Sequence, residues 1–300
     1  MEFDRDLRAR QEVRLLAQQA QQAFEGLQKL DQSGLDRITE ALSRAGALHA
    51  AELAREACAE TGFGNERDKT EKNRFAAVRV FEAIRGLRTV GILRKDDERR
   101  VWDVGVPVGV IAGIVPSTNP TSTVIYKSLI ALKAGSPIVF SPHPHAVRCT
   151  LHAARLMAEA AEAAGCPKGA ISTWRCAVRL DAVQELLRPR QAAPQPLATG
   201  GGAVVRAGLF DPASPPSASA TGSGPAYITA RPTSPRRAGR SIRSETFVRR
   251  HGLRLGAERH RPKRRCEARV REEFRKQGCL FPGHGGRPGA WRGCCLRPDV

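Results

Sequence analysis

A strand–turn–helix pattern, repeated between residues 108 and 165, constrains the fold more than any other feature of this sequence. Residues 108–115 form a continuous apolar and β-branched run, which is typical of a strand covered on both faces of a parallel sheet. A polar turn follows at 116–120, and residues 121–134 have the pattern of an amphipathic helix closed by glycine. A second strand follows, and after it a second helix that is closed by Gly165. This is the βαβ arrangement, in which ligands bind at the carboxyl ends of the strands.

Four helices and two short strands are predicted before this unit. Residues 4–30 carry apolar side chains at three- and four-residue spacing, a second helix surrounds Leu35–Leu42, and a third ends at Gly62. The short strands are expected around 89–93 and 99–104. A fourth helix begins near Arg67, and the side chains expected on its inner face are Phe75, Val78, Phe81, Ile84 and Leu87.

Positive charge is concentrated in the last part of the chain. Of the net charge of +19, residues 1–175 carry +4 and residues 176–300 carry +15. In the second part Arg outnumbers Lys 22 to 2, and 13 of the 20 prolines follow position 186. Surfaces that bind nucleic acids usually mix both cations with aromatic residues. A basic nucleic-acid-binding segment at 231–265 is therefore kept only as an alternative function.

Other classes of protein are not favoured by the sequence. No stretch approaches the roughly 18 uncharged apolar residues of a membrane span, and the N-terminus lacks the apolar core of a secretory signal. We therefore expect a cytoplasmic protein without a membrane partner. The eight cysteines form no C-x-x-C pair, and His143 and His145 lack a carboxylate or cysteine beside them, so no metal is expected.

Five motifs point to a known family. They are G-I-V-P-S-T-N-P-T-S-T at 113–123, K-S-L-I-A-L-K-A-G at 127–135, I-V-F-S-P-H-P at 138–144, E-T-G-F-G-N-E-R-D-K at 60–69 with the nearby K-N at 72–73, and L-A-T-G-G-G at 197–202. With these motifs, nearly all of residues 1–202 resembles the CoA-acylating, NAD-dependent aldehyde dehydrogenases. The resemblance implies an α/β fold with a doubly wound parallel sheet that binds NAD, a catalytic domain and an oligomerising flap. It also implies coenzyme A as co-substrate, a short acetaldehyde-like aldehyde and a homo-oligomer.

The resemblance assigns site residues by position. Asn119 would be the oxyanion-hole asparagine, whose amide donates to the aldehyde oxygen as negative charge develops there. The alternative is that Asn119 only caps the helix that begins near Thr121 and that the glycines only make a turn. The residues expected to line NAD are Ser117, Thr118 and Pro120 on the nicotinamide side, and Thr199, Gly200, Gly201 and Gly202 where backbone must approach the dinucleotide.

The catalytic cysteine of this family is not found in its expected place. It should follow a T-F pair within a motif like C-A-S-E, but Thr246 and Phe247 are followed by V-R-R-H-G-L-R-L-G-A-E. A change of reading frame would explain this, because GC-rich codons for residues 252–256 read A-C-A-S from their second base. We therefore expect residues 1–202 to hold the N-terminal helices and the NAD domain. Residues 203–300 are expected to be a degraded remainder of the NAD domain and the start of the catalytic domain, without a packed hydrophobic core at 203–222 and 231–265. The chain would then be catalytically impaired; a non-catalytic NAD-binding remnant is a further alternative.

Overall fold

The computed structural model describes most of the first 174 residues and short segments after them. The chain has two compact units, of which the first comprises Met1–Thr61 and Lys69–Thr221. In the second unit, β8 (Cys279–Leu280) pairs antiparallel with β9 (Cys295–Leu296). The described residues are 5–174, 183, 185–186, 195–200, 217–220, 272, 279–280 and 295–296.

A parallel sheet of five strands forms the centre of the first unit. Along the sheet the strand order is β5-β4-β3-β6-β7, and every neighbouring pair is parallel. The chain therefore starts in the middle with β3, moves outward to β5, and returns past β3 to β6. This confirms the doubly wound α/β fold and places its topological switch point between β3 and β6. The strands are β3 (Ile111–Ile114), β4 (Ile138–Ser141), β5 (Ile171–Thr173), β6 (Gln195–Gly200) and β7 (Ser217–Ala220).

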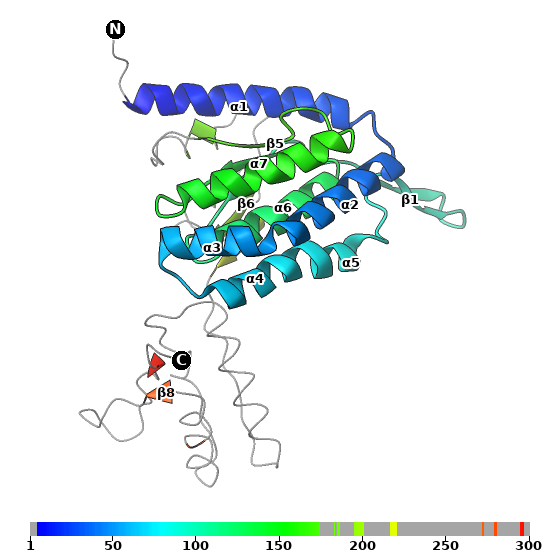
Figure 1. Cartoon of the computed structure of the whole chain (residues 1–300). Coiled ribbons are helices and arrows are strands. Elements are labelled where there is room, and N and C mark those ends of the chain that lie inside the picture. Colours follow the sequence, from blue (N-terminus) through cyan, green and yellow to red (C-terminus); the bar gives the residue numbers. More distant parts are fainter. Residues whose placement is uncertain are drawn as a thin grey trace, which may run out of the picture. The chain divides into compact units, whose positions relative to one another are not determined.

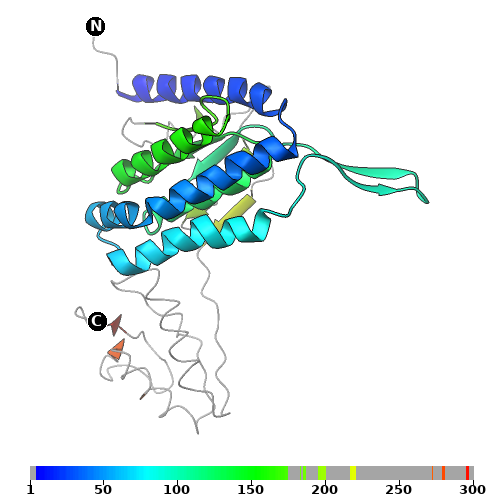
Figure 2. The same cartoon turned by 45° about the vertical axis from the view of Figure 1, so that its right-hand side comes forward.

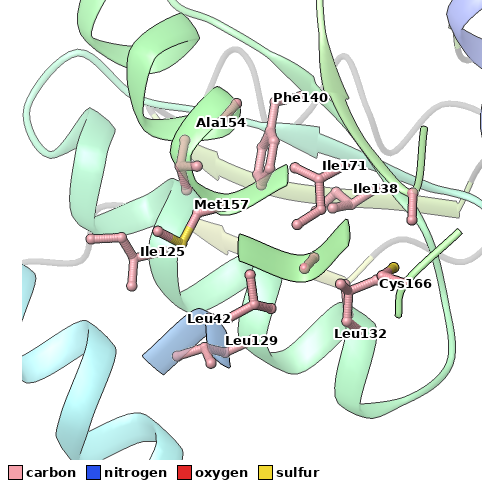
Figure 3. Packing of buried hydrophobic residues seen from close by; sticks show 14 of the residues in the cluster. Leu42, Ile125, Leu129, Leu132, Ile138, Phe140, Ala154, Met157, Cys166 and Ile171 are labelled. Atoms are coloured by element: carbon pink, nitrogen blue, oxygen red, sulfur yellow. The ribbon is translucent and has the colours of Figure 1, made fainter. Parts of the chain in front are cut away.

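Helices cover both faces of this sheet (Figure 1). Phe140 and Ile138 of β4 belong to the larger core cluster, where Figure 3 shows them with Leu129, Met157 and other apolar side chains. Val139, between them, belongs to a second cluster with side chains of α1, as expected for a strand buried on both faces. In chain order the helices are α1 (Arg5–Leu27), α2 (Gln32–Leu48), α3 (Ala50–Thr61), α4 (Glu66–Arg74), the π-helical segment η1 (Phe75–Arg79), α5 (Val80–Ile84), α6 (Pro120–Lys133) and α7 (Val147–Ala163).

The π-helical segment η1 changes which side chains of the fourth predicted helix face the core. Val78, Phe81 and Ile84 pack against the larger cluster, as predicted. The prediction was wrong for Phe75 and Leu87, whose exposed fractions are 60% and 55%. A π-helical turn contains more residues than an α-helical one, so the 3.6-residue pattern loses its phase where η1 begins at Phe75. Leu87 lies beyond the end of α5 at Ile84, so it has no place on the helix.

Strand β7 lies within residues 203–222, which were predicted to lack a packed hydrophobic core. Ser217–Ala220 adds a fifth strand beside β6. Strand pairing uses backbone hydrogen bonds, so the prediction about the core stays a prediction. Residues 203–216 and 231–265 lie outside the described residues.

A β-hairpin projects from the layered part of the first unit (Figure 2). It consists of β1 (Gly91–Asp96) and β2 (Val101–Gly105), which pair antiparallel and lie close to the two short strands predicted. Several large apolar side chains on it are exposed. Among the described residues, no helix has the length and apolar character needed to cross a membrane.

The packing of β3 against β4 yields a test of the core. A Cβ at Gly113 would lie 2.8 Å from Cδ1 of Phe140 and 2.9 Å from Cδ1 of Ile138. We expect Gly113→Ala to lower the free energy of unfolding by about 1–3 kcal/mol, because an added methyl overpacks a filled core. Urea unfolding of the full chain measures this. Gly86→Ala is the control, since a Cβ there meets nothing within 4 Å; equal losses in both variants would contradict the packing.

Candidate functional site

The turn after β3 carries four of the predicted site residues. Ser117, Thr118 and Asn119 are half-buried, and Pro120 is buried at the first position of α6. Proline suits this position because its fixed φ angle matches a helix and its missing N–H would have no helical partner. The backbone carbonyl of Asn119 accepts hydrogen bonds from the backbone N–H of Thr123 at 3.3 Å and from its hydroxyl at 2.6 Å. The turn is thereby fixed to the first turn of α6.

The side-chain amide of Asn119 is held by a lysine from another element. Nζ of Lys72 donates to Oδ1 of Asn119 at 2.8 Å, while Nδ2 lies 3.3 Å from Oγ1 of Thr118. An ammonium group can only donate, so this contact fixes which end of the amide is oxygen and leaves Nδ2 as the donor. Asn119 occupies the N-cap position of α6, but its side chain makes no capping hydrogen bond. The capping alternative is therefore wrong for the side chain.

Helix α4 anchors the same turn at two further points. Nζ of Lys69 donates to the backbone carbonyl of Thr118 at 2.8 Å. Asn73 accepts a hydrogen bond from the hydroxyl of Thr121 at 3.0 Å. Lys69 and Asn73 are one helical turn apart, which puts them on one face of α4 together with Lys72. Burial lowers the pKa of Lys69 from its ordinary value, and its side chain is only 5% exposed.

A lysine side chain of helix α6 links β3 and β6 by hydrogen bonds. Nζ of Lys127 donates to the carbonyl of Ile114 at 2.8 Å and to the carbonyl of Leu197 at 2.6 Å. The Lys127 side chain is fully buried, and burial lowers its pKa to about 7. The preceding residue, Tyr126, places its hydroxyl 3.0 Å from Oγ1 of Thr199. Burial raises the pKa of Tyr126.

The topology brings the two groups of predicted site residues to one edge of the sheet. Ile114 of β3 pairs with Ala198 of β6, so the turn after β3 and the last residues of β6 lie at the carboxyl ends of neighbouring strands. Thr199 and Gly200 are those last residues, whereas Gly201 and Gly202 lie outside the described part of the chain. Small and polar residues at a switch point are suited to binding a dinucleotide. The contact of each residue with NAD stays a prediction.

A family model described as the aldehyde dehydrogenase family matches residues 6–188, more than half of the chain. The chain belongs to the aldehyde dehydrogenase family. It is 42% identical over 177 residues to an aldehyde-alcohol dehydrogenase of Streptococcus pneumoniae, a match that covers 59% of this chain and 20% of that protein. It is 30% identical over 195 residues to the acetylating succinate-semialdehyde dehydrogenase of Clostridium kluyveri, covering 65% of this chain and 42% of that protein.

A solved structure of this family shows the same architecture. The acetylating aldehyde dehydrogenase of Geobacillus thermoglucosidasius matches with a TM-score of 0.85 and 42% identity, over 94% of this chain and 62% of that one. The chain therefore spans about a fifth of the length of the S. pneumoniae relative and less than two thirds of the solved one. These relatives confirm the resemblance to acylating aldehyde dehydrogenases.

Four residues of this aldehyde dehydrogenase site were not recognised from the sequence as site residues. Lys69, Lys72 and Asn73 appeared only as part of a family motif, and Lys127 only as the first letter of another. Their K-x-x-K-N spacing places three polar side chains on one helix face next to the π-helical segment, which is a signal for a shared partner. The partner itself, the turn at 116–120, lies more than 40 residues away and could not be read from that spacing.

Two cysteines in this part of the aldehyde dehydrogenase fold are not suited to be nucleophiles. Cys149 and Cys166 are buried. Burial raises the pKa of both thiols, that of Cys166 to about 12. The thiolate is the reactive form of cysteine, so both remain inert thiols at neutral pH. Cys176, Cys266 and Cys294 lie outside the described residues.

The buried ammonium of Lys127 makes stability depend on pH in a defined direction. Its pKa is about 7 in the folded chain, whereas its ordinary value is 10.5. Between these values the unfolded chain binds more protons, so the free energy of unfolding rises with pH by up to about 1.4 kcal/mol per unit. Lys127→Met should lack this gain. Urea unfolding at pH 7 and pH 9 measures it, with the exposed Lys95→Met as control.

If the free energies of unfolding of the wild type and Lys127→Met differ by the same amount at both pH values, the buried ammonium does not cause the pH dependence of stability. If Lys95→Met shows the same pH-dependent difference, the effect is not specific to the β3–β6 contact.

Proposed function

We propose that this chain carries the NAD-binding part of a CoA-dependent acylating aldehyde dehydrogenase. The reaction of such an enzyme converts a short aldehyde, CoA and NAD into acyl-CoA and NADH, or the reverse. Residues 1–202 would form the cofactor-binding part, and residues 203–300 the altered remainder of that domain and the start of the catalytic one. The observation that carries the proposal is the switch point between β3 and β6, where Asn119 and Thr199 lie on adjoining strand ends.

Proteins that share this fold and bind CoA compounds or NADP⁺ support the proposed cofactors. A propionaldehyde dehydrogenase of Rhodopseudomonas palustris holds propionyl-CoA, and an engineered glycolyl-CoA reductase holds NADP⁺. Both are 23% identical to this chain, with TM-scores of 0.72 and 0.69, so the likeness extends to the fold. Together with the acetylating relatives, they support NAD or NADP and CoA as the ligands of this architecture.

Asn119 is the residue that we propose acts on the aldehyde. Its Nδ2 would donate to the aldehyde oxygen while negative charge develops there, and Lys72 supports this by holding Oδ1 on the opposite end of the amide. A donor fixed before the reaction needs no reorganisation when the charge appears, and this is how such groups lower the barrier. Bound NAD would accept the hydride from the carbon that carries the aldehyde oxygen.

The exposed hairpin supports an oligomer. Large apolar side chains on β1, β2 and the segment after them are about half exposed or more, and large exposed apolar patches usually mark contact surfaces. We propose that this hairpin is the oligomerising flap implied by the family, in a homo-oligomer located in the cytoplasm. The alternative of nucleic-acid binding by residues 231–265 has no support from the relatives. The exposed side chains are Leu93, Val101, Trp102, Val104, Val106 and Val108.

Binding of the cofactor can be measured directly. We expect the full chain to bind NAD in isothermal titration calorimetry. Gly201→Val should weaken binding by about tenfold or more, because a branched side chain in the glycine run at 200–202 would intrude on the dinucleotide. Gly86→Val, in the turn after α5, is the control and should bind as the wild type does. Absence of NAD binding by folded chain would remove the cofactor assignment.

Activity is expected to be absent despite cofactor binding. No cysteine stands in the expected motif after Thr246 and Phe247, and without a covalent nucleophile the hydride donor is not formed. NADH formation from acetaldehyde and CoA should therefore stay at the background rate. Cys266 is the nearest later cysteine, and its basic neighbours favour a thiolate. Turnover that is abolished in Cys266→Ser would show that the nucleophile was misplaced.

A further inference from the structure

A cluster of two glutamates and two histidines joins α3 to α7, away from the predicted cofactor site. Glu52 and Glu56 lie one turn apart on α3, and His152 reaches them from α7. Each of these three side chains is half-buried and offers one potential ligand atom, and the three atoms lie within 4.8 Å of one another. The set therefore combines one imidazole and two carboxylates, the ligand types that bind Zn²⁺ together in many proteins.

The contacts within this cluster leave a position for a cation. Nδ1 of His152 lies 2.7 Å from Glu56, and its Nε2 lies 3.9 Å from Oε1 of Glu52. When a neutral His152 donates from Nδ1 to Glu56, the lone pair of Nε2 faces the carboxylate of Glu52. Two electron-rich atoms then face each other, and a cation between them would satisfy both. At a tetrahedral zinc ion, bonds of about 2.0–2.1 Å place ligand atoms about 3.4 Å apart, so these two atoms need to approach each other by only about half an ångström.

His49 prepares Glu52 for this role. Nδ1 of His49 lies 2.9 Å from Oε2 of Glu52, the carboxylate oxygen that does not face His152. This hydrogen bond fixes one oxygen of Glu52 and leaves the other directed at His152. Metal-binding carboxylates are commonly held by such an outer hydrogen bond.

We propose that Glu52, Glu56 and His152 form a Zn²⁺ site that fastens α3 to α7. Nε2 of His152 and Oε1 of Glu52 would bind the ion, with water completing its coordination. Glu56 would keep its hydrogen bond to Nδ1 of His152 and so orient the imidazole, as outer carboxylates do for zinc-binding histidines. The site could not be recognised from the sequence, because His152 lies 96 residues from Glu56. The expectation of no metal had considered only the cysteines, His143 and His145.

Calorimetric titration of the full chain with Zn²⁺ tests the site. Cysteines are first alkylated with N-ethylmaleimide so that thiols do not compete. We expect one ion per chain and a higher melting temperature in the wild type, with both effects lost in His152→Asn and in Glu52→Gln. His49→Asn should weaken binding by about 10- to 100-fold, since it removes only the outer hydrogen bond. His145→Asn is the matched control and should behave as the wild type does.

Two results would overturn the zinc site. One is the absence of stoichiometric binding by the wild type, and the other is equal affinity in wild type and His152→Asn. X-ray absorption at the zinc edge of the wild-type complex needs no variant to fold. We expect only nitrogen and oxygen neighbours at about 2.0–2.1 Å, whereas sulfur neighbours would place the ion at cysteines and reject the proposal.

Discussion

The buried ammonium of Lys127 lies where the two halves of the sheet meet. It donates to one carbonyl of β3 and one of β6, and these are the two strands between which the chain reverses its direction of winding. Removing the ammonium of Lys127 from water is unfavourable, and for this reason burial lowers its pKa. The two carbonyl acceptors offset part of that loss. The same contact holds the strand ends that present Asn119 and Thr199, so the candidate site depends on it.

Around this contact the site is assembled from elements that are distant in sequence. Helix α4 contributes Lys69 and Lys72 to the turn after β3, and α6 contributes Tyr126 to the end of β6. Each contact restricts one group: a backbone carbonyl, an amide oxygen or a hydroxyl. The amide of Asn119 is thereby oriented before any ligand arrives. Preorganised donors of this kind are more effective than flexible ones, because no binding energy is used to arrange them.

The sequence predicted the periodic parts of this fold well. Strands β3 and β4 and helices α6 and α7 were found within a few residues, because burial on both faces or on one face leaves a period in the apolar residues. Phe75 was misplaced because a π-helical turn leaves no such period in the apolar residues. Leu87 was misplaced because it lies beyond the end of α5. Family motifs identified Asn119, but the lysine that orients it lies 47 residues away on a helix whose packing only the structure shows. The Glu52–His152 pair was missed for the same reason.

Hydrogen–deuterium exchange of the full chain, with and without NAD, tests the placement of the cofactor at the β3–β6 switch point most directly. A ligand there should slow amide exchange in residues 114–122 and 197–200, because the turn after β3 and the end of β6 lie at the same edge of the sheet. Exchange in the projecting hairpin at 91–105 should stay unchanged in the same samples. Slowed exchange confined to other segments, or no change at saturating NAD, would contradict this account.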